Sequence, residues 1–114
     1  MKIAVLVKQV PGSESSLPIN ESNDWIDESS ITYVMNPPDN FALEEALIIK
    51  EKMGSGEVVV VSMGPSRVQK VIREGLAKGA DRGIHIQEDE NTETDPLIIS
   101  ERFTEALKSE NFDL

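Results

Sequence analysis

Unbroken runs of apolar residues limit what this chain can fold into. They are "IAVLV" at 3–7 and "EVVVVSM" at 57–63, with a shorter run, "GIHI", at 83–86. A strand with one buried face alternates apolar and polar residues, whereas a continuous apolar run is typical of a strand covered on both faces. The sequence therefore predicts three strands inside a parallel sheet.

Helical patterns separate and follow these strands. Apolar residues recur at helical spacing from Phe41 to Met53 and from Ser66 to Lys78. A third helix is expected to begin after Asp95, a good N-cap residue, with Pro96 at its first position. The order β-α-β-α-β-α predicts an open α/β fold, a parallel sheet with helices on both faces. We expect the buried side of the third helix to consist of Leu97, Ile98, Ile99, Phe103, Ala106 and Leu107.

Two local features bear on the helix predicted from Ser66 to Lys78. Ser66 and Gln69 have the spacing of a capping box, in which each side chain bonds the other residue's backbone N–H. Gly75 lies in the middle of this helix, where glycine costs about 1 kcal/mol relative to alanine. We expect Gly75 to be there because the helix approaches the sheet closely.

The connection between the first strand and the first helix is unusually long. The segment from Val10 to Met35 has 26 residues, whereas such loops usually have about 2–6. Apolar residues alternate on both sides of the turn-rich "NESND", which predicts a β-hairpin excursion at about 11–35 over the top of the sheet. At the other end, "NFDL" begins an apolar run where a fourth strand is expected. We therefore expect residues 1–114 to be the N-terminal part of a single α/β domain, truncated before or within strand four.

Composition excludes several classes of protein. The chain has no cysteine, which excludes a disulfide scaffold and a thiolate metal site. Its net charge of −10 argues against nucleic acid and anionic membranes as partners. The apolar run at 3–7 is too short for a signal peptide or a membrane span, so we expect a cytoplasmic protein without membrane insertion.

No motif for catalysis or metal binding emerges from the sequence. There is no phosphate-binding loop, and the glycine pair at 54 and 56 precedes a strand instead of following one. His85 lies in a predicted strand without a second metal ligand nearby in the sequence. The acidic stretch at 88–95 lacks the regular spacing of a calcium loop and is expected to be solvated. We therefore predict no catalytic residues and no metal site.

The geometry of the fold gives a candidate binding site. Ligands of open α/β sheets bind at the carboxyl ends of the strands, and the first strand leads to "NPPD" at 36–39. Pro37 and Pro38 have no backbone N–H, so this helix start presents carbonyls and the side chains of Asn36 and Asp39. Asp39 would repel a phosphate, which favours an adenine edge or ribose hydroxyls. A rigid helix start without any ligand is about equally compatible with the residues.

Four blocks of the sequence resemble the electron transfer flavoprotein β subunit. These are "KIAVLVKQVP", "MNPPDNFALEEAL", "VVVSMGPS" and "GLAKGADRGIHI", in the order and spacing of that family. The resemblance implies an adenine nucleotide hydrolase-like, Rossmann-like fold that binds AMP or a second FAD, in a heterodimer with an α subunit that carries the redox FAD. It implies an electron carrier, not an enzyme, serving flavoprotein dehydrogenases or NADH and downstream acceptors. Carried over by position, the cofactor-binding residues are Leu6, Asn36, Pro37, Pro38, Asp39 and Met63.

Two other readings remain beside this one. The first is a stand-alone regulatory module of the universal-stress type that binds adenine nucleotides. The second is an adenylating enzyme, which would need a serine- and glycine-rich loop after the first strand. The sequence there, "KQVPGSESS", does not have that pattern.

Overall fold

The structure is a computed structural model that describes residues 1–89 and 95–114. Three strands form a parallel sheet in the order β1-β4-β5, and two short strands form a separate antiparallel pair. The elements are β1 (Lys2–Leu6), β2 (Gln9–Pro11), the 3₁₀ helix η1 (Glu28–Ser30), β3 (Tyr33–Met35), α1 (Pro37–Met53), β4 (Glu57–Gly64), the 3₁₀ helix η2 (Ser66–Val68), α2 (Gln69–Lys78), β5 (Arg82–Gln87) and α3 (Pro96–Leu107).

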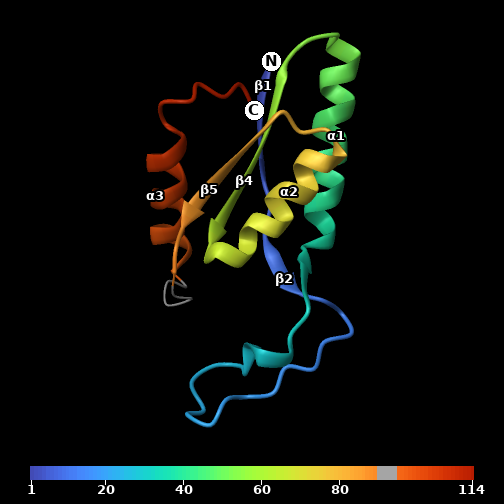
Figure 1. The fold of residues 1–114 in the computed structure, drawn as a ribbon. Helices are drawn as coiled ribbons and strands as arrows, with labels where there is room; N and C mark the ends of the chain where they lie inside the picture. Colours follow the sequence, from blue (N-terminus) through green and yellow to red (C-terminus); the bar gives the residue numbers. More distant parts are fainter. Residues whose placement is uncertain (90–94) are drawn as a thin grey trace.

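The predicted open α/β fold is confirmed. Helices α1 and α2 lie on one side of the parallel sheet and α3 lies on the other (Figure 1). The middle strand, β4, is covered on both faces, because Val58 to Val61 are all fully buried. This burial explains why β4 is a continuous run of valines. Its neighbours in the core include Ile3, Val5, Leu43, Ala46, Val71 and Ile72.

Gly75 lies at a close approach of α2 to the sheet, as the sequence predicts. A Cβ atom built at Gly75 would lie 2.7 Å from Cγ2 of Val60 on β4. This distance is shorter than carbon atoms tolerate, so a side chain at position 75 would push the helix away from the sheet or displace Val60.

We expect the Gly75→Ala substitution to destabilise the protein despite the higher helix propensity of alanine. The overlap with Val60 should cost about 1–3 kcal/mol, measured by urea denaturation. In a Val60→Ala background the obstructing methyl groups are gone, and the same substitution should be neutral or stabilise by up to about 1 kcal/mol. An equal loss of stability in both backgrounds would show that the two residues do not collide.

The predicted N-terminal cap is confirmed for α3 and is wrong for α2. Asp95 caps α3 as predicted, since its Oδ1 accepts a hydrogen bond of 2.8 Å from Leu97 N. The predicted capping box of Ser66 and Gln69 is wrong. Ser66 lies inside the 3₁₀ helix η2, and neither η2 nor α2 has a side-chain cap hydrogen bond. The tighter 3₁₀ turn provides the entry to α2 in place of the box.

Helix α3 is less buried than its apolar sequence predicts. None of its residues is fully buried, and Leu97 is 68% exposed. The prediction that Leu97 and Ile98 form a buried side is wrong, because α3 packs mainly against β5. Of the predicted acidic loop at 88–95, residues 90–94 lie outside the described part of the structure. Glu88, at its start, pairs with Arg102 of α3 at 2.6 Å.

The long connection between β1 and α1 is an antiparallel excursion, as predicted. Its base is the pairing of β2 with β3, in which Val10 is opposite Val34. Farther out, one isolated bridge joins Ile19 to Ile26, and most of the remaining backbone is irregular. Figure 1 shows the excursion extending away from the carboxyl end of the parallel sheet instead of folding flat over it.

The outer edge of β1 is paired at one point. Ala4 N donates to Leu114 O at 2.8 Å, and Lys2 O accepts from Asp113 N at 2.9 Å and from Leu114 N at 3.4 Å. The bonds on either side of Leu114 are the ones a parallel ladder would have, with Leu114 beside Ile3. The apolar run predicted to begin a fourth strand therefore lies where that strand would start.

Ion pairs hold this C-terminal segment to β1 and β5 directly, and to β4 through Arg82. The carboxylate of Glu110 lies 2.8 Å from Lys2 Nζ and 2.6 Å from Arg82 Nη2. Arg82 also pairs with Glu57 of β4 at 3.1 Å. The hydrogen bonds from Arg82, and then those from Lys2, lower the pKa of Glu110 to about 2 from its ordinary value of 4.5.

The depressed pKa of Glu110 gives a prediction for stability at low pH. A carboxylate with a lowered pKa stabilises the folded state above its unfolded pKa and loses that contribution as pH falls through the folded one. The Glu110→Gln variant should therefore have a lower urea midpoint than the parent at pH 7, and the difference should shrink as pH falls from about 4.5 toward 2. Glu105→Gln, which removes an exposed i,i+3 pair with Lys108, is the matched control and should show little difference at either pH. A Glu110→Gln difference that does not change with pH would contradict this account.

Candidate functional site

The carboxyl ends of β1, β4 and β5 lie at the end of the sheet from which the excursion extends (Figure 1). Ligands of open α/β sheets bind at this end, where the strands lead into loops and helix starts. The predicted site residues belong to the ends of β1 and β4 and to the first turn of α1.

The first turn of α1 has its backbone donors satisfied or absent. Helices begin with four N–H groups that have no partner within the helix. Here Pro37 and Pro38 have no N–H, Asn36 N donates to Lys8 O at 2.7 Å, and Asp39 N donates to Asn36 O at 3.0 Å. None of these four positions offers a free N–H group to a phosphate. The helix start presents carbonyls and polar side chains, as the two prolines predict.

Asp39 joins this turn to the end of β1. Its Oδ2 accepts a hydrogen bond of 2.7 Å from Lys8 N, and its Oδ1 accepts one of 3.1 Å from Asn36 Nδ2. Each carboxylate oxygen has a further lone pair. Asp39 is thus held in place and can still accept hydrogen bonds from the hydroxyl groups of a sugar.

A hollow of about 410 Å³, within the size range of small-molecule sites, opens at the carboxyl end of the sheet; Lys8, whose backbone N–H binds Asp39, lines it. Its walls come from the segment that follows β1, the excursion, the end of β4, η2 and the start of α3. Met63 lines it, as does Lys8, whose ammonium makes no ion pair with any residue that the structure describes. Trp25 and Tyr33 add two aromatic rings from the excursion.

The predicted residues gather in one region but do not line one cavity. Leu6 is 49% exposed and lines a separate groove between the outer edge of β1 and α1. Pro37 lines a different hollow, beside the excursion, and Pro38 is exposed. The six residues therefore border the carboxyl end of the sheet from several sides, and Met63 is the predicted residue that lines the hollow there.

Arg67 and its neighbours form a cluster that the sequence did not indicate. Arg67 Nη1 donates to Gln9 Oε1 at 2.6 Å, and Gln9 Nε2 donates to Arg67 O at 3.2 Å. The guanidinium carbon lies 3.8 Å from the centre of the Tyr33 ring. Burial, and then a hydrogen bond with Glu28, raise the pKa of Tyr33 above its ordinary value. The available signal was position alone, since Gln9 and Arg67 each follow a strand end.

These residues suit an adenine nucleotide. The hollow offers aromatic faces for a planar base. Asp39, which lies outside the hollow's lining, offers acceptors for sugar hydroxyls near the end of β1. The charges of its lining are mixed: Lys8 and Arg67 are positive and Glu28 and Glu88 are negative, and Arg67 is paired with Glu28. The backbone of α1 supplies none of the phosphate binding, so that role would fall to side chains or to other segments.

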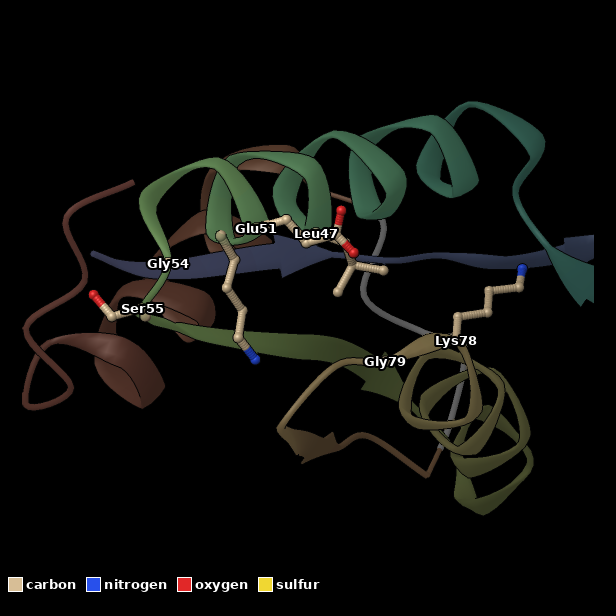
Figure 2. A pocket seen from close by; sticks show the side chains of 8 residues that line it. Leu47, Glu51, Gly54, Ser55, Lys78 and Gly79 are labelled. Carbon is tan, nitrogen blue, oxygen red and sulfur yellow. The ribbon is translucent and has the colours of Figure 1, made fainter.

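Another hollow, of about 340 Å³, lies at the opposite end of the sheet, where the strands begin (Figure 2). It is bordered by the ends of α1 and α2 and by the turn at Gly54 and Ser55. Its two lysines are paired within the protein: Lys50 contacts Asp81 at 2.5 Å, and Lys78 contacts Glu74 at 3.0 Å. Nothing in this hollow distinguishes a ligand site.

Two further features of the described residues bear on the class of function. Across residues 1–89 and 95–114, no group of three or more histidine, aspartate or glutamate side chains is placed to hold a metal ion. His85 is half-buried, with Nε2 2.8 Å from Gly64 O, which fits a structural role. No helix within these ranges is both long and apolar enough to cross a membrane.

Comparison with known proteins gives a consistent result. The family model described as "Electron transfer flavoprotein domain" matches residues 24–114. The electron transfer flavoprotein subunit β of Methylophilus methylotrophus is 42% identical over 115 residues, which cover all of this chain and 44% of that protein. The human subunit β is 33% identical over 116 residues, covering all of this chain and 46% of that protein. Protein FixA of Sinorhizobium fredii is 35% identical over 94% of this chain and 37% of its own length.

The chain spans less than half the length of the curated relatives it matches. Within that span the similarity covers the sheet, the excursion and all the predicted site residues. The family model covers most of the chain. The chain therefore belongs to the electron transfer flavoprotein domain family, and it resembles the β subunits of that family along its whole length.

Proposed function

We propose that the chain is the N-terminal, nucleotide-binding part of an electron transfer flavoprotein β subunit. The observation that carries this proposal is the similarity to proteins named as β subunits over the full length of the chain. The geometry at the carboxyl end of the sheet supports it. Asp39 is fixed by the backbone of Lys8, and Lys8 also lines a hollow that has aromatic and charged walls.

In this proposal the subunit carries electrons and catalyses no bond-making reaction. It works as a heterodimer with an α subunit, and FAD held by or shared with that subunit supplies the redox chemistry. The residues of this chain bind AMP or a second FAD through Leu6, Asn36, Pro37, Pro38, Asp39 and Met63. Flavoprotein dehydrogenases or NADH deliver the electrons, which pass on to downstream acceptors.

Co-expression tests the proposed assembly. The gene for this protein is expressed together with that of a candidate α subunit, with an affinity tag on the α subunit alone. We expect the two chains to copurify at a ratio of one to one with the absorption spectrum of a bound flavin. Recovery of the tagged subunit without this chain, or of a complex without flavin, would contradict the proposal.

A further inference from the structure

The ladder between β1 and β4 ends before the candidate site begins. Its last backbone hydrogen bond runs from Val7 N to Val61 O at 2.8 Å. Beyond that point the two chain segments diverge. One continues through Lys8 and Gln9 into the excursion, and the other continues through Met63 and Gly64 into η2.

Arg67 connects these two segments again. Its side chain donates to the amide oxygen of Gln9 at 2.6 Å, and the amide nitrogen of Gln9 donates to the backbone carbonyl of Arg67 at 3.2 Å. Its guanidinium also stacks on Tyr33 of β3 and lies 3.5 Å from Glu28 of η1. A planar guanidinium makes this combination of a stacked face and a directed N–H donor, which an ammonium group cannot reproduce.

The connection leads directly to the groups proposed to bind nucleotide. Gln9 follows Lys8, whose backbone N–H and C=O hold Asp39 and Asn36 respectively, each at 2.7 Å. Gln9 also pairs with Met35, the residue before Asn36. Met63 lies four residues before Arg67 at the end of β4. Fixing Gln9 to Arg67 therefore fixes the Asn36–Asp39 turn relative to Met63.

We infer that Arg67 is a positioning residue for the nucleotide site: it holds the base of the excursion and the first turn of α1 in register with the end of β4. The inference rests on the proposed function, because it names the residue that keeps two parts of that site together. Arg67 acts through Gln9 and Tyr33.

The experiment uses the whole protein, purified with any subunit that copurifies. Hydrogen–deuterium exchange is measured on peptides covering 9–11 and 33–36, and the dissociation constants of AMP and FAD are measured by calorimetry after bound ligand is removed. The variants are Arg67→Met, Arg67→Lys and, from the other side of the contact, Gln9→Met. Arg73→Met is the matched control, because Arg73 is an exposed residue of α2 with no ion pair to any described residue.

In Arg67→Met and Gln9→Met we expect faster exchange in both peptides and a nucleotide dissociation constant raised about tenfold. The double variant Arg67→Met/Gln9→Met should bind nucleotide no more weakly than the weaker-binding single variant, since both substitutions remove the same contact. Arg67→Lys should bind nucleotide more tightly than Arg67→Met but less tightly than the parent. Arg73→Met should match the parent in both exchange and affinity. Far-UV circular dichroism confirms that each variant is folded, and Gln9→Met carries the test if Arg67→Met is not.

Three results would overturn the inference, and they differ from one another. Unchanged exchange would show that Arg67 does not hold the excursion. Faster exchange with unchanged affinity would show that its role is structural only. Failure of the parent protein itself to bind either AMP or FAD would refute the proposed function, and the positioning role with it.

Discussion

Replacing Asp39 by alanine is expected to weaken AMP or FAD binding at least about tenfold and to lower the free energy of unfolding by about 1–2 kcal/mol. The carboxylate accepts hydrogen bonds from Lys8 N and Asn36 Nδ2, at 2.7 and 3.1 Å. Without it the first turn of α1 loses its attachment to the end of β1. The nucleotide also loses an acceptor that is held in a fixed orientation.

Two variants separate these effects in calorimetric titration and urea denaturation. Asp39→Asn keeps one acceptor oxygen and should lose less affinity than Asp39→Ala. Glu44→Ala removes an exposed carboxylate farther along the same helix and should change neither quantity measurably. If Asp39→Ala bound the nucleotide as tightly as the parent, Asp39 would not be part of the binding site.

The Leu43→Ala substitution is expected to have the largest effect on stability, a loss of about 2–5 kcal/mol. Leu43 is 1% exposed and belongs to the core between α1 and the sheet. Truncation removes buried methyl groups and leaves a cavity that the surrounding valines of β4 fill poorly, because they are β-branched and stiff. Urea denaturation followed by circular dichroism measures the loss.

Phe41→Ala is the matched control for Leu43→Ala. Phe41 lies two residues earlier on the same helix but is 76% exposed. Removing its larger side chain should change the free energy of unfolding by less than about 0.5 kcal/mol. If Phe41→Ala were as destabilising as Leu43→Ala, the face of α1 assigned to the core would be wrong.

Features set by residues close in sequence were predictable. The valines of β4 indicate a strand buried on both faces, and Asp95 followed by Pro96 indicates a helix start. Gly75 indicates a close approach of helix and sheet, although not which residue it would meet. These predictions succeeded because burial and capping leave a local trace in residue type.

Features that depend on distant pairing were not predictable. Gln9 and Arg67 are 58 residues apart, and nothing in either neighbourhood indicates their contact. Ser66 had the spacing of a capping box, but the chain enters α2 through a 3₁₀ turn. Leu97 had the periodicity of a buried residue, but α3 covers too little of the sheet to bury it. Periodicity shows which side of a helix is apolar and not how much of that side is covered.

The position of the predicted residues in the fold was predictable, whereas their side-chain neighbours were not. The carboxyl end of the sheet and the first turn of α1 followed from the fold and from "NPPD". The sequence did not indicate that Lys8, Tyr33 and Arg67 line one hollow, because they come from three separate segments that only the tertiary fold brings together.

Identification of the bound ligands tests the central claim most directly. The protein is purified with its copurifying subunit, ligands are released by heat, and they are identified by chromatography with absorbance and mass detection. We expect one FAD and one AMP per heterodimer, or two FADs if this subunit binds the second flavin. A purified protein that releases neither flavin nor adenine nucleotide would contradict both the nucleotide site and the proposed role in electron transfer.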